Sequence, residues 1–111
     1  WQPTTLDEAL KAARELRGQG LGTAIVKLGA KGLAYASADG EGTIEPFKVN
    51  AIDTVAAGDC FNGGLAHALE TGMPLAQALR FASACGALST TKKGAASAAP
   101  TKAEVEKFLN A

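Results

Sequence analysis

Apolar residues recur every three or four positions in the first part of the chain, which is the spacing of one helix face. They follow the segment Thr5–Glu8, whose threonine and glutamate have the pattern of a capping box at a helix start. The predicted buried face carries Leu6, Leu10, Ala13 and Leu16. Three glycines between positions 18 and 22 then predict the end of the helix and a turn.

The pattern changes to short runs of strand-forming residues between positions 23 and 50. Thr23–Leu28 is apolar on both faces, which is typical of a strand in the interior of a sheet. Leu33–Ser37 predicts a second strand, and Ile44–Asn50 a third, with Pro46 favouring an edge or a bulge. The turn between the second and third strands is predicted at 38–42. Such short connections indicate an antiparallel section of sheet.

Helical spacing returns in the second half. One predicted helix ends near Gly72, and Pro74 takes the first position of the next, which runs to about Ser89. Small residues dominate positions 82–88, so this helix is expected to pack closely against a neighbour. Thr101–Glu104 is a second capping box, at the start of a short last helix. The apolar face of the first of these helices consists of Phe61, Leu65, Ala68 and Leu69. The apolar face of the last helix consists of Val105, Phe108 and Leu109.

Composition narrows the function classes. With 111 residues, of which 47% are hydrophobic, the chain can bury one core. Eleven basic residues balance eleven acidic ones, so charge gives no case for binding nucleic acid or an anionic membrane. No apolar run approaches the length of a membrane span, and a cytoplasmic protein is expected. The two cysteines, Cys60 and Cys85, lack metal-ligand spacing; small apolar packing residues are the first interpretation, and a reactive Cys60 is the alternative.

The segment Asp53–Asp59 carries the chemistry. Its two carboxylates lie six residues apart with small residues between them, and the second opens a helix. Ala57 and Gly58 leave the backbone N–H groups accessible, and a helix start favours an anion such as phosphate. Asp59 could accept a proton from a hydroxyl that attacks this phosphate. The pattern therefore suggests phosphoryl transfer to an alcohol, although aspartate and glycine also occur at helix starts for capping alone.

The same segment resembles the second signature of the ribokinase family of sugar kinases, the phosphofructokinase-B group. Lys27–Gly32 is similar to the family's nucleotide-binding loop. Phe81–Ala84 and Lys92–Ala95 are similar to its adenine-side helix and the loop that follows. The resemblance implies an α/β fold over residues 1–111: the C-terminal part of a three-layer α/β/α fold, with a small antiparallel strand section and three or four helices. The family's N-terminal part and lid are absent.

The resemblance also implies roles for individual residues. Asp59 is the base that takes the proton of the sugar's primary hydroxyl, and so also contacts the sugar. The implied anion hole consists of Ala56, Ala57 and Gly58. The implied nucleotide-binding residues are Lys27, Leu28, Gly29, Ala30, Lys31, Gly32, Gly58 and Ser83. His67, two turns beyond Asp59, is interpreted as a surface or half-buried structural residue.

ATP, Mg²⁺ and K⁺ are the implied cofactors. The monovalent cation site would use Asp53, Val55, Ser89, Lys92, Gly94 and Ala98, mostly through backbone carbonyls. Ala98 stands where the family pattern has a serine, and Ser97 lies beside it.

Within the family, the motifs are closest to those of enzymes that convert D-ribose to ribose 5-phosphate. Fructokinases, 2-keto-3-deoxygluconate kinases and nucleoside kinases are the alternatives, together with a non-catalytic nucleotide-binding module. The expected partners are the sugar and ATP. The intact enzyme is expected to be a homodimer, and the segment alone to be inactive and prone to self-association.

Overall fold

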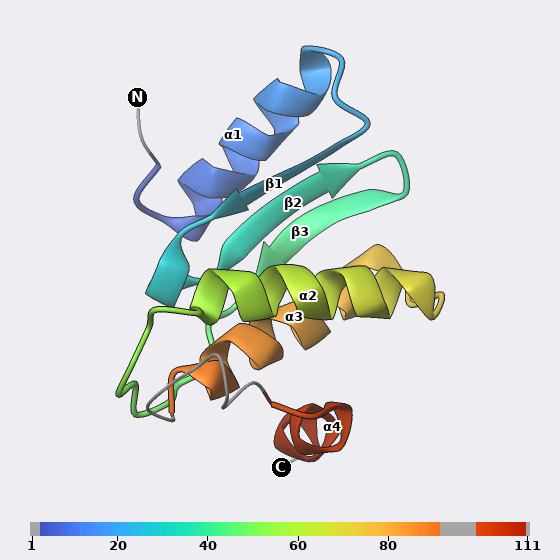
Figure 1. Ribbon diagram of the computed structural model, residues 1–111. Coiled ribbons are helices and arrows are strands. Elements are labelled where there is room, and N and C mark those ends of the chain that lie inside the picture. Colours follow the sequence, from blue (N-terminus) through green and yellow to red (C-terminus); the bar gives the residue numbers. More distant parts are fainter. Residues whose placement is uncertain (1–2, 92–99, 111) are drawn as a thin grey trace. The chain divides into compact units, whose positions relative to one another are not determined.

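The computed structural model describes residues 3–91 and 100–110, and the chain divides into two units, Trp1–Pro46 and Phe47–Ala111. The first unit contains helix α1 and strands β1, β2 and β3, and the second contains helices α2, α3 and α4 (Figure 1). Each unit has a hydrophobic cluster of its own.

Helix α1 (Leu6–Gly18) begins at the predicted threonine cap. The side-chain oxygen of Thr5 accepts a hydrogen bond from the Glu8 amide at 3.2 Å. The Glu8 carboxylate accepts from the amide of Thr4 at 3.1 Å, so the reciprocal bond of the capping box is displaced by one residue. The predicted buried face is partly wrong, because Leu16 is 38% exposed. The helix buries small residues instead, which allow it to lie close to the sheet: Ala9, Ala12 and Ala13.

The sheet of the first unit is antiparallel, as predicted. Its strands are β1 (Thr23–Lys27), β2 (Leu33–Ser37) and β3 (Gly40–Ile44), in the order β1-β2-β3. Helix α1 covers one face of this sheet and contacts all three strands (Figure 1). The small cluster between them consists of Ala13, Ala24 and Ala36, with Val26 packed against it.

The connection between β2 and β3 is shorter than predicted. Only Ala38–Asp39 form the turn, and Gly40 already pairs with Ser37. The hydroxyl of Ser37 donates to the Gly40 carbonyl at 3.0 Å and accepts the Asp39 amide at 3.3 Å. Because this serine closes a tight turn, residues 40–42 join the strand instead of extending a loop.

Two strand predictions are therefore corrected. The strand predicted over 44–50 is wrong, since β3 ends at Ile44 and residues 45–50 form no strand. Pro46 has no N–H group with which to continue the ladder. The first strand was expected inside a sheet, but β1 lies at an edge of the described sheet, and Ala24 is its only buried residue.

The second unit is helical. Helices α2 (Ala57–Glu70) and α3 (Leu75–Ser89) pack along each other, and α4 (Lys102–Leu109) packs against α3. Pro74 is the N-cap of α3, one position earlier than predicted. The predicted capping box of α4 is confirmed, with Thr101 and Glu104 bonded in both directions. The core of the unit consists of Ala68, Ala78, Phe81, Ala84, Cys85 and Val105.

Close packing of α2 on α3 depends on small residues, as positions 82–88 predicted. A Cβ atom built on Gly64 would lie 2.7 Å from the sulfur of Cys85. On α3, a Cβ atom at Gly86 would lie 3.1 Å from the carbonyl oxygen of Ala57. The two helices reach this separation because each lacks a side chain where it meets the other.

Substituting the two neighbouring glycines of α2 should therefore have opposite effects. We expect Gly64→Ala to lower the free energy of unfolding by about 1–3 kcal/mol, because the added methyl overlaps Cys85. Gly63→Ala should raise it by up to about 1 kcal/mol, because the site is open and alanine favours helix. Urea unfolding of both variants measures the difference. Equal effects would contradict the packing described here.

Candidate active site

The first turn of α2 presents unpaired backbone donors. The helix begins at Ala57 without a side-chain cap, and the Ala57 amide donates to the carbonyl of Thr54 at 3.2 Å. The amides of Gly58 and Asp59 have no acceptor among the described residues. A Cβ atom at Gly58 would have nothing within 4 Å, so the backbone there is open to an approaching group. Two N–H groups at a helix start can bind an anion.

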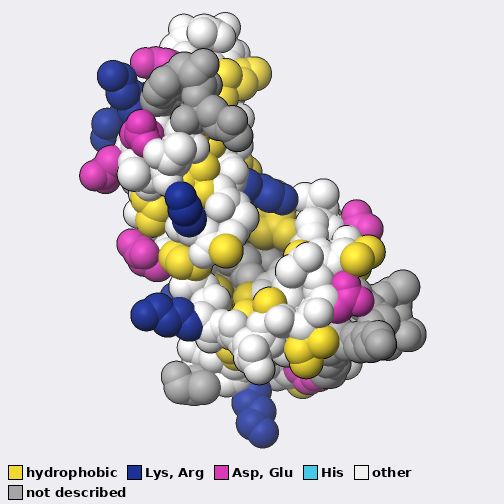
Figure 2. Space-filling model, turned by 90° about the vertical axis from the view of Figure 1, so that its left-hand side faces the viewer, with side chains coloured by type: hydrophobic (Ala, Val, Ile, Leu, Met, Phe, Trp, Pro, Cys, Tyr) yellow, Lys and Arg dark blue, Asp and Glu magenta, His cyan; other side chains and the backbone are white. Residues whose placement is uncertain are grey.

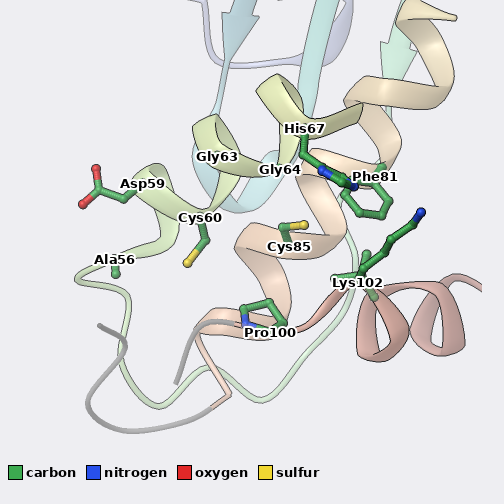
Figure 3. Close-up of a pocket in the computed structure, with 11 residues that line it drawn as sticks. Ala56, Asp59, Cys60, Gly63, Gly64, His67, Phe81, Cys85, Pro100 and Lys102 are labelled. Atoms are coloured by element: carbon green, nitrogen blue, oxygen red, sulfur yellow. The ribbon is translucent and has the colours of Figure 1, made fainter. Parts of the chain in front are cut away.

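Asp59 stands beside these donors. Its side chain is exposed and lies at one end of a cavity of about 510 Å³ within the second unit. Figure 3 shows its carboxylate directed away from the labelled side chains of α3. An exposed carboxylate in this position can accept a proton from a hydroxyl group arriving from solvent.

The walls of the cavity come from three helices and include residues for which the sequence predicted no role in the site. His67 comes from α2, Phe81 from α3 and Lys102 from α4 (Figure 3). The rings of His67 and Phe81 are tilted against each other, with centroids 6.1 Å apart. No periodicity connects these positions along the chain, and only the packing of the helices brings them to one cavity. His67 was interpreted as structural, and it is an exposed residue that lines this cavity.

One carbonyl in the last turn of α3 has no donor among residues 3–91 and 100–110. The carbonyls of Ala87 and Leu88 accept hydrogen bonds from the two threonines that follow the helix. The carbonyl of Gly86 accepts from the Ser89 hydroxyl at 2.7 Å. No described residue donates to the carbonyl of Ser89 itself. This oxygen is one of the predicted cation ligands.

The segment before α2 is tied to the same end of α3. The amides of Ile52 and Asp53 donate to the carbonyl of Thr90 at 2.6 and 3.0 Å. The Asp53 carboxylate also accepts the Val55 amide at 3.0 Å, which forms a tight turn. Asp53 is therefore bonded to Thr90, the residue that follows Ser89 at the carboxyl end of α3. The cation site itself stays a prediction. Oxygen donors of this kind suit a hard cation.

The predicted nucleotide loop belongs to the first unit. Lys27 is the last residue of β1, a short 3₁₀ turn follows at Gly29–Lys31, and the Leu28 amide donates to the Gly32 carbonyl at 2.8 Å. Gly32 has a φ of +100°, and a Cβ atom there would overlap the carbonyl oxygen of Ile44. The loop thus needs glycine at this position, for its backbone angle and for its contact with β3.

Five predicted site residues remain to be placed. Ala56 is the N-cap of α2. Ser83 lies on α3 and is half-buried. Lys92, Gly94 and Ala98 lie outside the described residues. Among the residues that the structure describes, no group of three or more His, Cys, Asp or Glu side chains could hold a metal ion.

The buried thiol of α3 makes the second unit sensitive to alkaline pH. Burial, with a smaller contribution from the nearby Cys60, raises the pKa of Cys85 from 9.0 to about 11. A pKa that is higher in the folded state favours folding below pH 9, and this contribution is lost as the pH rises through about 11.

We therefore expect the unfolding free energy to fall more steeply between pH 9 and 11 in the unsubstituted protein than in Cys85→Ala. The extra slope should be at most about 1.4 kcal/mol per pH unit. Cys60→Ser should keep most of it. Parallel slopes for all three proteins in urea unfolding would show that Cys85 does not titrate in this way.

The distribution of surface charge and the length of the helices bear on binding to nucleic acid or to a membrane. On the face shown in Figure 2, the described Lys and Arg side chains are interspersed with Asp and Glu. None of the helices described here has the length and apolar character needed to cross a membrane.

Comparison with known proteins matches residues 1–102 to the pfkB family of carbohydrate kinases. A ribokinase from Haemophilus influenzae is 45% identical over 101 residues, which cover 91% of this chain and 33% of the relative. Fructokinase-1 of Zea mays is 42% identical over 92 residues, covering 77% of this chain and 28% of the relative. The chain thus spans about a third of the length of these relatives.

Solved structures agree with the sequence matches. A ribokinase from Thermotoga maritima is 42% identical, with a TM-score of 0.82 over 92% of this chain and 34% of its own. An Escherichia coli protein provisionally named ribokinase II, in complex with ATP and Mg²⁺, is 31% identical, with a TM-score of 0.80 over 96% of this chain and 37% of its own. A fructokinase double mutant from Vibrio cholerae, with fructose, ADP and potassium bound, is 32% identical. Its TM-score is 0.76, and the match covers 89% of this chain and 34% of the fructokinase.

Proposed function

Because the chain belongs to the pfkB family of carbohydrate kinases, we propose that it is the nucleotide-binding and catalytic C-terminal segment of an ATP-dependent sugar kinase. The proposed reaction is phosphorylation of the primary hydroxyl of a sugar, with D-ribose as the first candidate. The observation that carries the proposal is the first turn of α2, where an exposed carboxylate, Asp59, adjoins two backbone amides that have no acceptor within the described part of the chain.

Asp59 would act as the general base. Its carboxylate would accept the proton of the sugar hydroxyl while the hydroxyl oxygen attacks the γ-phosphate of ATP. The amides of Gly58 and Asp59 would donate to the phosphoryl oxygens, where negative charge develops. The predicted anion hole also included Ala56 and Ala57, in place of the Asp59 amide. The Ala57 amide donates to Thr54 and would have to exchange that partner to take part.

The predicted nucleotide-binding residues occur in both units: the loop Lys27–Gly32 in the first, and Ser83, on α3, in the second. A tight turn closed by a hydrogen bond between Leu28 and Gly32 leaves a compact backbone that a nucleotide can approach. Mg²⁺, when bound with ATP, would neutralise charge on the phosphates, and this ion is held largely by phosphates and water. The relative solved with ATP and Mg²⁺ supports both cofactors for this segment.

A potassium ion is the proposed occupant of the oxygen cluster at the end of α3. The carbonyl of Ser89, to which no described residue donates, and the carboxylate of Asp53, whose amide is bonded to Thr90, are suitable donors. Val55 would add a backbone carbonyl. The ion would fix the turn that precedes α2. The fructokinase structure with bound potassium supports this assignment at the level of the family.

Asp53→Ala should weaken the binding of potassium and so the activation of turnover by this ion. We expect the potassium concentration for half-maximal turnover to rise by about tenfold or more, because a charged ligand is lost. Asp39→Ala, which removes an exposed carboxylate from the β2–β3 turn, is the matched control. Potassium titrations of turnover measure the effect, and superimposable curves for Asp53→Ala and the control would refute the assignment.

The identity of the sugar substrate is a more specific proposal than kinase activity. Ribokinase and fructokinase relatives match this chain at 45% and 42% identity, so fructose is the second candidate. The deciding experiment measures ADP release by the kinase that contains this segment, with a coupled colour reaction as the readout. The acceptors are D-ribose, fructose, 2-keto-3-deoxygluconate and nucleosides. The highest kcat/KM for ribose supports the first candidate. A preference for another acceptor replaces it, and ATP binding without turnover on any acceptor would favour a non-catalytic module.

A further inference from the structure

We propose that Cys60 and Cys85 are a reactive thiol pair, which a low-molecular-weight disulfide such as oxidised glutathione closes into an intramolecular disulfide between α2 and α3. These are the two cysteines of the sequence, and both are free thiols. Both line the same cavity of about 510 Å³, one from each helix (Figure 3).

The glycines of α2 place the two thiols near each other. A Cβ atom built on Gly64 would lie 3.1 Å from the Cβ of Cys85, so Cys85 faces Gly64 directly. Cys60 precedes Gly64 by four residues, and side-chain sites at this spacing on a helix are about 5–6 Å apart on one face. At the next position of α3, a Cβ atom on Gly86 would lie 3.6 Å from the Cβ of Phe61, the residue after Cys60.

Closing the bond requires the two cysteines to approach by at most about one helical turn. A disulfide needs Cβ atoms about 3.5–4.5 Å apart, somewhat less than one turn of helix. Gly63 and Gly64 place no side chain between the thiols, so a slide of α2 along α3 with rotation of the two cysteine side chains can bring the sulfurs together. Both cysteines stand on helices, which limits the approach to this direction.

Exposure fixes the order of the two steps. Cys60 is partly exposed, whereas Cys85 is 6% exposed and its pKa is raised to about 11 by burial. A protonated thiol is a poor nucleophile, so Cys60 reacts first. The other ionisable groups that face the cavity are Asp59 and His67 from α2 and Lys102 from α4. The thiolate is the attacking species in both steps.

The chemistry balances with one molecule of oxidant. The Cys60 thiolate attacks one sulfur of oxidised glutathione, forms a mixed disulfide and releases one glutathione thiolate. The Cys85 thiolate then attacks the sulfur of Cys60 and releases the second glutathione. The two cysteines lose two protons and two electrons, and the oxidant gains them as two molecules of glutathione.

The new bond would fasten the turn that contains Asp59. Cys60 follows Asp59 directly, so the disulfide would hold the first turn of α2 against α3 and would reduce turnover reversibly. This consequence for turnover rests on the proposed function, whereas the bond itself does not.

The test follows the thiols by mass. The 111-residue chain is treated with oxidised glutathione at pH 8, quenched with iodoacetamide and analysed by mass spectrometry, folded and in concentrated guanidinium chloride. We expect the folded chain to become two hydrogens lighter, without retained glutathione, at least about tenfold faster than the denatured chain. Cys85→Ser should keep one glutathione, located on Cys60 by peptide mapping. Cys60→Ser should take up glutathione at least about tenfold more slowly.

Three results would overturn the proposal: equal rates of closure in folded and denatured chain, a mixed disulfide that persists in the unsubstituted chain, or faster labelling of Cys85 than of Cys60. Closure of the bond with unchanged turnover of the kinase would leave the thiol pair intact and remove only its effect on Asp59. If the reduced kinase phosphorylated no sugar, the proposed function would be contradicted, and the thiol pair would not.

Discussion

Asp59→Asn should lower the turnover of the kinase that contains this segment by about two to four orders of magnitude, the usual effect of losing a general base. Asparagine has nearly the same size and can still occupy the first turn of α2, but its amide cannot accept the proton of the attacking hydroxyl. Affinity for ATP should change little, because the backbone donors at Gly58 and position 59 remain. Steady-state kinetics with the sugar and binding calorimetry with ATP measure the two quantities.

Glu70→Gln is the matched control for this variant. It removes one negative charge from the same helix, at an exposed position at the opposite end of α2. We expect it to turn over like the unsubstituted enzyme. Turnover of Asp59→Asn at the level of this control would remove Asp59 from the mechanism, and a parallel loss of ATP affinity would assign it to binding.

Gly32→Ala is expected to cause the largest loss of stability in the first unit. Its φ of +100° and ψ of −156° lie in a region that glycine alone adopts readily, and strain there costs about 1–3 kcal/mol. The added methyl would also overlap the carbonyl of Ile44, a backbone atom that cannot rotate away. Together these effects should lower the unfolding free energy by roughly 2–5 kcal/mol.

Gly29→Ala separates the two causes. This glycine lies in the same loop with a φ of +59°, and a Cβ atom there would have nothing within 4 Å. It should cost only about 1–2 kcal/mol, the penalty of the left-handed backbone alone. Thermal or urea unfolding of the two variants provides the comparison. Equal losses would mean that the contact with β3 adds nothing to the requirement for glycine at position 32.

Local signals were sufficient for most element boundaries. The threonine caps of α1 and α4, the positive-φ glycine after α2 and the small residues of α3 each act within a few residues of their own position. They were therefore visible in the sequence. The third strand was misplaced because its start depends on one serine hydroxyl, which closes a two-residue turn at Ser37 that composition alone does not indicate.

The candidate site was predictable where it is a contiguous motif. The turn from Asp53 to Asp59 is such a motif, and the roles that the family resemblance implied for its residues stay predictions. The cavity beside Asp59 was not predictable. His67, Phe81 and Lys102 meet there only because α2, α3 and α4 pack around small residues, and the distances that decide this are tertiary.

The most direct test of the central claim is a chimera. This chain replaces the matching third of the Haemophilus influenzae ribokinase, and ribose-dependent ADP formation is measured with and without Asp59→Asn. If the chain supplies the nucleotide site and the catalytic base, the chimera phosphorylates ribose, and the substitution lowers turnover by at least about a hundredfold. A folded chimera without activity, or one that is equally active with asparagine at position 59, would contradict the account.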